Sequence, residues 1–140
     1  MGVESDVELL AIAGIDEPGT ADWSQSLADC YQAFHRVRGP DSVKRLGTYA
    51  VLPDQHRPEE PHFFLRMVGV LPGAQGRGFA RMLLDWLYEV SAYHPTSMGV
   101  ALNTDTNVNV AIYEHFGYEV LGRDALAGHT ISTMYRSNPK

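Results

Sequence analysis

The chain has 140 residues, of which 44% are hydrophobic and 20% are charged. This length suits one globular domain, and the apolar fraction excludes a wholly disordered chain. A net charge of −6 argues against nucleic acid and anionic membranes as partners. No apolar run approaches the roughly 18–20 residues of a membrane span, and residues 1–6 carry no base, unlike a secretory signal. Cys30 is the single cysteine, which excludes an internal disulfide, and we expect a cytoplasmic protein.

The first 61 residues are weakly patterned. An apolar stretch over residues 7–13 predicts a short strand, and apolar residues at helical spacing over 23–37 predict a helix that ends at Gly39-Pro40. Proline-rich residues 53–61 are typical of a loop. The residues expected to bound these elements are Gly14 after the strand and Thr20 or Asp22 at the start of the helix.

Residues 62–136 alternate between strand-like and helix-like segments. Buried strands are predicted over 62–71 and 98–103, each followed by a helix, of which the second is capped by Asp105 or Thr106. The expected apolar faces are Phe79, Met82, Leu83, Trp86, Leu87 and Val90 on the first helix, and Val108, Ala111, Ile112, His115 and Phe116 on the second.

Two more strands close the chain. Residues 118–121 and 130–135 predict an antiparallel pair around a loop that holds Gly122 and Gly128. The order of elements predicts an α/β or α+β domain in which a helical crossover joins adjacent parallel strands.

A loop with three glycines joins the strand at 62–71 to the helix that follows. Gly76, Gly78 and the small Ala80 let the main chain curl tightly and leave room for a ligand. The first N–H groups of a helix have no partner inside it and carry partial positive charge, so this segment suits a phosphate or diphosphate, and Arg77 adds a full charge. A tight turn that binds nothing is the alternative.

Two diphosphate-binding motifs do not fit this loop. A Walker loop needs Gly-Lys-Ser/Thr, which is absent. A dinucleotide fingerprint needs glycine or alanine where Arg81 stands and an acid near the end of the next strand, where Asn103 stands. The loop therefore indicates a phosphate-binding site of another kind.

Two signatures in this sequence resemble those of the GNAT superfamily, the acyl-CoA-dependent N-acyltransferases. Gln75-Gly76-Arg77-Gly78-Phe79-Ala80 is similar to the Gln/Arg-x-x-Gly-x-Gly/Ala signature, and Val70-x-Pro72 fits the strand-to-loop step before it. Residues 109–118, Asn-Val-Ala-Ile-Tyr-Glu-His-Phe-Gly-Tyr, are similar to the second signature. The resemblance covers roughly residues 62–136.

The resemblance implies that acetyl-CoA lies in a splay between the parallel strands at 63–70 and 98–103. The pantetheine arm would complete the ladder of the first strand, since unpaired strand N–H and C=O groups need partners. An N–H near Val68 or Gly69 would donate to the thioester carbonyl. The residues assigned to the acyl-CoA are Val68, Gly69, Val70, Gln75, Gly76, Arg77, Gly78, Phe79, Ala80 and Asn109.

The implied reaction is direct attack of a primary amine, from a small molecule or a peptide, on the thioester through a tetrahedral intermediate. Tyr113 is the expected general acid for the departing sulfur, with core packing as the alternative role. Many relatives carry a glutamate as base where this chain has Asn103, so His62, or Glu59 or Glu60 nearby, is the candidate base, with an ordinary surface role as the alternative. The histidines show no metal-ligand spacing, so no metal is expected.

We expect residues 1–140 to form a single GNAT-like domain, with an acyl-CoA-binding core over 62–136. The family normally has two strands and one or two helices ahead of the strand at 62–71, plus an intervening strand, so residues 1–61 are expected to be an abbreviated N-terminal portion. The acceptor site is then open, completed by a second subunit in a homodimer, or impaired. The acidic net charge suits a cationic acceptor. The alternatives are a non-catalytic acyl-CoA-binding module, a truncated inactive homologue, and a nucleotide-binding domain that uses the same loop.

Overall fold

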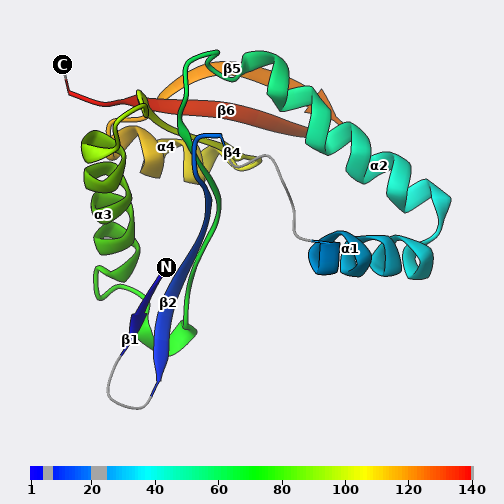
Figure 1. Ribbon diagram of the computed structural model, residues 1–140, viewed down its shortest axis with the longest axis horizontal. Coiled ribbons are helices and arrows are strands. Elements are labelled where there is room, and N and C mark those ends of the chain that lie inside the picture. The colour runs from blue at the N-terminus through cyan, green and yellow to red at the C-terminus, as the bar shows by residue number, and fades with distance from the viewer. Residues whose placement is uncertain (5–7, 20–24, 140) are drawn as a thin grey trace.

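The structure is a computed structural model that describes residues 1–4, 8–19 and 25–139 (Figure 1). It has a mixed α+β fold, as predicted, with a six-stranded sheet in the order β1-β2-β3-β4-β6-β5. None of the described helices is long and apolar enough to cross a membrane. The elements are β1 (Gly2–Glu4), β2 (Leu9–Asp16), α1 (Gln25–Arg38), α2 (Pro40–Val51), the 3₁₀ helix η1 (Leu52–His56), β3 (Phe63–Val70), the 3₁₀ helix η2 (Pro72–Ala74), α3 (Phe79–Tyr93), β4 (Gly99–Thr104), α4 (Asn107–His115), β5 (Glu119–Leu126) and β6 (His129–Ser137).

The segment before β3 holds more structure than the one strand and one helix predicted. β1 pairs antiparallel with β2, and β2 pairs antiparallel with β3, passing through Gly14 instead of ending there. α1 ends at Arg38 as predicted, but Pro40 then begins α2. The fixed φ of proline suits the first position of a helix, and Asp41 favours the first turn through the helix dipole. The predicted caps at Thr20 and Asp22 lie outside the described residues.

The alternation of strands and helices from β3 to β6 is confirmed. The Thr106 side chain accepts a hydrogen bond from the Asn109 N–H at 3.2 Å, so Thr106 is the cap of α4. Gly117 follows α4 with φ +84°, as expected for a left-handed helix end. Gly122, predicted in a loop, instead lies within β5, whereas Gly128 lies in the β5–β6 turn.

The predicted buried face of α3 was partly wrong. Met82 and Trp86 are 54% and 45% exposed. The apolar residues of α3 form a stripe too wide for their spacing to decide which edge faces inward, and contact with the sheet decides it. The side chains of α3 that are buried are Leu83, Leu84, Leu87 and Ser91.

The side of α4 that was predicted to face the core was also wrong. Val108, predicted to face inward, is 71% exposed, whereas Val110 is 7% exposed. Tyr113 and Phe116 pack against the core from the same side as Val110. The cap at Thr106 fixes where the helix begins, so the inward stripe runs through Val110 and Tyr113 at i and i+3 spacing.

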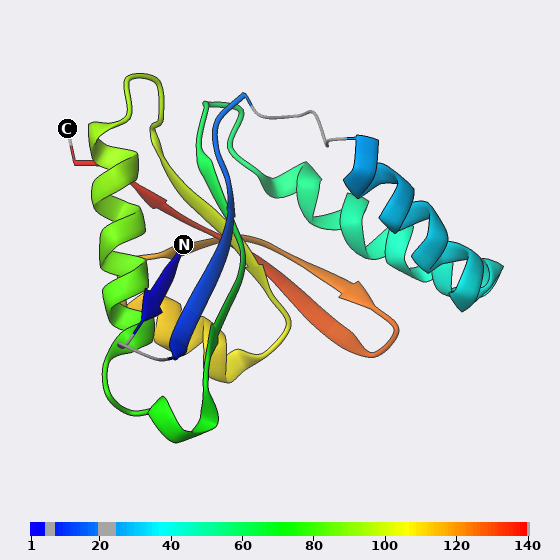
Figure 2. The ribbon, with the colours of Figure 1, turned by 60° about the horizontal axis from the view of Figure 1, so that its bottom comes forward.

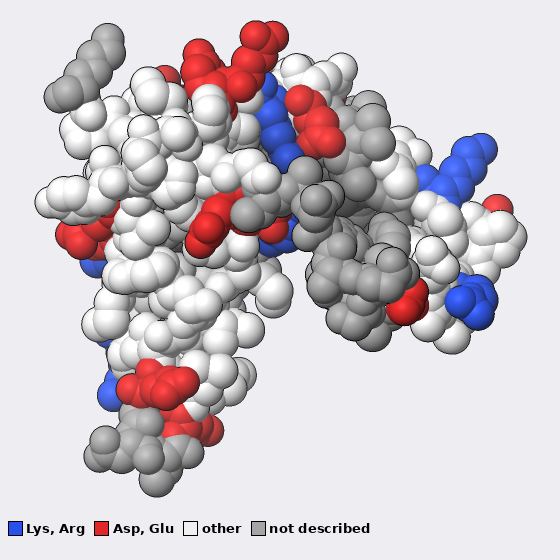
Figure 3. Space-filling model, in the orientation of Figure 1, with Lys and Arg blue, Asp and Glu red and all other residues white. Residues whose placement is uncertain are grey.

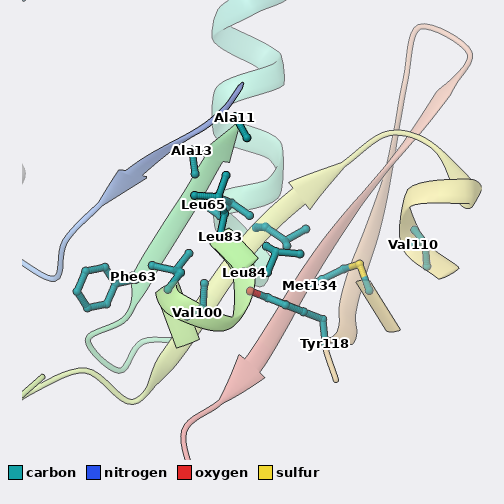
Figure 4. Close-up of a cluster of buried hydrophobic side chains, with 12 residues drawn as sticks. Ala11, Ala13, Phe63, Leu65, Leu83, Leu84, Val100, Val110, Tyr118 and Met134 are labelled. Carbon is teal, nitrogen blue, oxygen red and sulfur yellow. The ribbon is translucent and has the colours of Figure 1, made fainter. Parts of the chain in front are cut away.

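The main core lies between one face of the sheet and helices α3 and α4 (Figure 4). Val100 and Leu102 of β4 point into this core. Because side chains alternate along a strand, Asn103 lies on the opposite face, together with its partner Thr133 on β6. The Thr133 hydroxyl donates to the Pro53 carbonyl at 3.4 Å, which places η1 on that opposite face. Helices α1 and α2 form an arm on the side of the sheet away from α3 (Figures 1 and 2).

A buried polar cluster ties the end of α3 to the start of β4 and to the C-terminal segment. Ser91 Oγ lies 2.7 Å from Ser97 Oγ and donates to the Gly99 carbonyl at 3.0 Å. Asn138 Nδ2 donates to the carbonyls of Ser91 and Ser97 at 2.8 Å. This cluster holds the amino end of β4 in register, opposite to the end where α4 begins.

Candidate functional site

The parallel strands β3 and β4 are joined along only part of their length. Their paired residues are Phe63 with Val100, Phe64 with Ala101, and Leu65 with Leu102. Beyond these pairs β3 continues along β2, and β4 continues along β6. The two strands therefore part toward their carboxyl ends, which confirms the expected splay.

The backbone groups that face this gap follow from the hydrogen bond that ends β3. The Leu71 N–H donates to the Leu10 carbonyl of β2 at 2.9 Å. Because successive residues of a strand turn their N–H and C=O groups to opposite sides, Gly69 also faces β2. Val68 and Val70 turn their N–H and C=O groups to the gap. Of the two candidate donors to a thioester carbonyl, Val68 is therefore the one with the suitable orientation.

The glycine loop after β3 leaves open space around its main chain. Gly76 and Gly78 have φ values of +75° and +84°, a left-handed conformation that glycine adopts with little strain. A Cβ atom at either position would meet nothing within 4 Å. Gln75 Nε2 lies 3.5 Å from the Val70 carbonyl, at the edge of the gap. The loop thus leads directly from the open strand edge to the start of α3.

The first turn of α3 presents unused hydrogen-bond donors. Gly78 is the cap residue and has no side chain to cap the helix. Its carbonyl accepts the first helical bond, from the Met82 N–H at 3.0 Å, so the N–H groups of residues 79–81 precede the helical ladder. The side chain of Arg77 is exposed beside them, with its guanidinium carbon 5.1 Å from the Phe79 ring centre. Together they suit a dianionic group such as a diphosphate.

Helix α4 brings the second signature to the same edge of the sheet, since it follows the carboxyl end of β4. Asn109 is exposed near the start of α4. Tyr113 is partly buried, with its ring centre 5.7 Å from that of Tyr118 in an edge-to-face arrangement. Burial raises the pKa of the Tyr113 phenol, so it keeps its proton well above neutral pH. Tyr113 is therefore suited to donate a proton.

The structure places the candidate base His62 away from this edge. His62 directly precedes β3, about 20 Å from Val68 at roughly 3.3 Å per residue. Its Nδ1 lies 2.7 Å from the Glu60 carbonyl and, facing an acceptor, carries the hydrogen. Glu59 precedes the same closed end of the strand pair. Among the described residues, no three His, Cys, Asp or Glu side chains lie close enough to hold a metal ion.

Asn103 lies where the strands part, one residue beyond the last paired position of β4. Its Oδ1 is buried and, within the described part of the chain, has no hydrogen-bond partner. A buried acceptor without a partner is costly, so Asn103 lowers the local stability of the fold beside the gap. Strand alternation could have indicated the face on which Asn103 lies, but only the fold shows that Oδ1 is unpaired.

Comparisons with known proteins agree with this arrangement of elements. The histone acetyltransferase HPA2 and related acetyltransferase from Corynebacterium glutamicum superposes with a TM-score of 0.57 at 16% identity, covering 98% of this chain and 62% of that one. Chaetomium thermophilum Naa20, solved with a bisubstrate analogue, gives a TM-score of 0.61 at 16% identity, covering 98% and 64%. An N-acetyltransferase from Staphylococcus aureus Mu50 gives 0.60 at 18% identity, covering 96% and 67%.

At these identities the likeness to solved structures is one of fold, and the chain spans less than two thirds of the length of the first two. The sequence itself gives a more specific match. The model of a family described as the acetyltransferase (GNAT) domain matches residues 36–120, more than half of the chain. The matched residues include the glycine loop and both signatures, and the chain belongs to the GNAT acetyltransferase family.

Proposed function

We propose that this chain transfers an acetyl group from acetyl-CoA to a primary amine of a small molecule or a peptide. The reaction forms a bond from the amine nitrogen to the acetyl carbon and breaks the bond from that carbon to sulfur. The observation that carries the proposal is the gap between β3 and β4, which opens beside the glycine loop. Family membership supports the same chemistry.

The residues around the gap fit the parts of acetyl-CoA in order. Val68 and Val70 offer N–H and C=O groups that can pair with the amides of the pantetheine arm. Asn109, exposed at the start of α4, can hydrogen-bond the pantetheine from the side of β4. The N–H groups of residues 79–81, which precede the helical ladder, and the charge of Arg77 suit the diphosphate. The Val70 carbonyl also accepts a long hydrogen bond from Gln75 Nε2, at 3.5 Å, which the ligand would replace.

Two groups of the chain would assist the transfer. The Val68 N–H points into the gap and would donate to the carbonyl oxygen of the thioester, where negative charge develops. A donor of this kind lowers a barrier by on the order of 3–4 kcal/mol. Tyr113 would give its phenolic proton to the departing sulfur, so that coenzyme A leaves as the neutral thiol.

The amine must also lose a proton. Asn103 is not a base, because its side-chain amide does not take up a proton, and its Oδ1 is buried. His62 stays a prediction as the base, and from the amino end of β3 it would act only through a chain of water molecules. Water itself is then the simplest acceptor of the amine proton.

Thiol release from acetyl-CoA over a panel of amines tests the proposal, with calorimetry to measure acetyl-CoA binding separately. We expect binding and amine-dependent release of thiol. Binding without release above the hydrolysis background would indicate a non-catalytic acyl-CoA-binding module. Adenosine diphosphate analogues that bind as tightly as acetyl-CoA would indicate a nucleotide-binding domain instead.

A further inference from the structure

A cavity of about 290 Å³ lies between the helical arm and the β5–β6 hairpin. Figure 2 shows the arm and the hairpin extending in the same direction from the sheet. The cavity lies just below the usual size range of small-molecule sites, so it suits a small ligand or the end of a chain. The residues that line it include Arg38, Ser42 and Arg45 from the arm, Asp105 from the β4–α4 loop, and Leu126 and Ile131 from the hairpin.

The register of the sheet places this cavity next to the gap between β3 and β4. Asn103 of β4 lies opposite Thr133 of β6, and Ile131 lies two residues from Thr133 on the same face. Ile131 is thus a diagonal neighbour of Asn103, with their Cβ atoms about 7–8 Å apart. Asp105 follows Asn103 by two residues and lines the same cavity. The cavity therefore comes within two residues of Asn103 along the chain, at Asp105 of the β4–α4 loop.

The arm supplies two guanidinium groups to this cavity. Arg45 Nη2 donates to the Ser42 hydroxyl at 3.1 Å, and the Arg38 guanidinium carbon lies 4.6 Å from the Phe34 ring centre. Neither arginine forms an ion pair with a carboxylate among the residues that the structure describes. On the face shown in Figure 3, basic side chains also stand at the outer end of the arm. Guanidinium groups without a carboxylate partner favour a ligand that brings its own oxyanion.

The rest of the lining completes the chemical description of the ligand. Leu126 and Ile131 form an apolar wall, and Ile131 is almost fully buried. Ala127 and Gly128 both have positive φ, which gives the hairpin the tight turn that holds this wall in place. Asp105 puts a negative charge at the end nearest Asn103. The cavity lining is thus positively charged at the arm and negatively charged at the carboxyl end of β4.

We propose that this cavity is the acceptor site of the transfer reaction and that the acceptor is an amine that also carries an oxyanion, a carboxylate or a phosphate, held by Arg38 and Arg45. The inference rests on the proposed function. The amine lies toward Asp105, two residues beyond Asn103, and the apolar part of the acceptor lies against Leu126. The net charge of −6 favours a cationic acceptor, but the local arrangement of charges outweighs it.

Matched amines test the proposal by steady-state thiol release. Leucine is compared with isoamylamine, which lacks the carboxylate, and phosphoethanolamine with ethanolamine. We expect the KM of the preferred oxyanion-bearing amine to be at least about tenfold below that of its neutral counterpart, the factor that one lost charge-assisted hydrogen bond gives. The pair that shows the difference identifies the oxyanion as carboxylate or phosphate.

Arg38→Gln and Arg45→Gln should each raise the KM of the oxyanion-bearing amine about tenfold and leave that of the neutral amine unchanged. Arg36→Gln is the matched control, because Arg36 is an exposed arginine of α1 that does not line this cavity. Thiol release with equal KM values for both members of each pair would overturn the acceptor assignment and leave the transferase function standing.

A binding measurement separates the two proposals further. If acetyl-CoA binds but no amine releases thiol, the transferase proposal fails. The binding of N-acetylleucine and of phosphoethanolamine to the CoA-saturated chain is then measured by calorimetry. It tests whether the cavity binds an oxyanion. Binding that weakens in Arg38→Gln and not in Arg36→Gln supports an oxyanion site at the arm. An absence of binding overturns it.

Discussion

Replacement of Gly78 by valine tests the assignment of the glycine loop most directly. Gly78 has φ +84°, a conformation that costs a branched side chain about 1–3 kcal/mol. A Cβ atom there would enter open space, so the new side chain meets no protein atom. It would instead cover the free N–H groups at the start of α3, where we place the diphosphate. The variant should therefore fold and fail to bind acetyl-CoA.

Gly128→Val provides the matched control. Gly128 has the same φ of +84° and the same open surroundings, but it lies in the β5–β6 turn. Both variants should lose about 1–3 kcal/mol of unfolding free energy in urea. Only Gly78→Val should lose two charge-assisted hydrogen bonds to the diphosphate, worth about 3 kcal/mol or more, which is an increase of more than about 100-fold in Kd.

Isothermal titration calorimetry with acetyl-CoA measures the difference between the two variants, and urea unfolding checks that their stabilities match. If Gly78→Val binds acetyl-CoA within about threefold of Gly128→Val, the diphosphate lies elsewhere and the loop is only a tight turn. Equal loss of binding in both variants would mean that backbone strain, and not a blocked site, is responsible.

Three further variants probe the catalytic group, the charge at the loop and the anchor of β4. Tyr113→Phe should lower kcat about 100-fold with little change in the Kd of acetyl-CoA, and equal losses in both would mean that the hydroxyl only positions the ligand. Because burial raises the pKa of Tyr113 above its usual value of 10, kcat of the wild type should hold through pH 9, and a fall below that pH would contradict its role as the acid. Arg77→Gln should weaken acetyl-CoA binding about tenfold and reduce its dependence on salt, and a salt dependence equal to that of the wild type would place Arg77 outside the site. Ser91→Ala should lower the urea-unfolding free energy by about 1–3 kcal/mol and leave acetyl-CoA binding unchanged, since Ser91 is buried in the cluster behind β4, and an unchanged stability would show that the cluster contributes little.

The glycine loop could be predicted because its chemistry is local. Positive φ at Gly76 and Gly78, a helix start without a cap and a nearby arginine all belong to consecutive residues. The N-cap Thr106 is local in the same way, because its side chain bonds three residues ahead. Such features depend on short-range hydrogen bonding and sterics, which sequence spacing records directly.

The features that sequence reasoning missed depend on tertiary contacts. Pro40 reads equally well as the end of one helix or the start of another, and in the fold it starts α2, which lies in contact with α1. Val108 and Val110 are equally apolar, and only contact with the sheet makes Val110 the buried one. Intrinsic propensity is a weak guide wherever two local choices are nearly equal in energy.

The diphosphate end of the candidate site and the proposed acceptor cavity are therefore built from different kinds of segment. The diphosphate end comes from one continuous segment, residues 75–80, whereas the proposed acceptor cavity joins the arm, the β4–α4 loop and the hairpin, which lie far apart in the sequence. A substitution in the arm changes the acceptor cavity without moving the loop that faces the gap between β3 and β4. This separation permits the acceptor to change while the chemistry at the gap stays the same. Along β4 and the loop after it, Asn103 at the gap and Asp105 in the cavity lining are two residues apart, so the acceptor assignment depends on a short connection between the two parts.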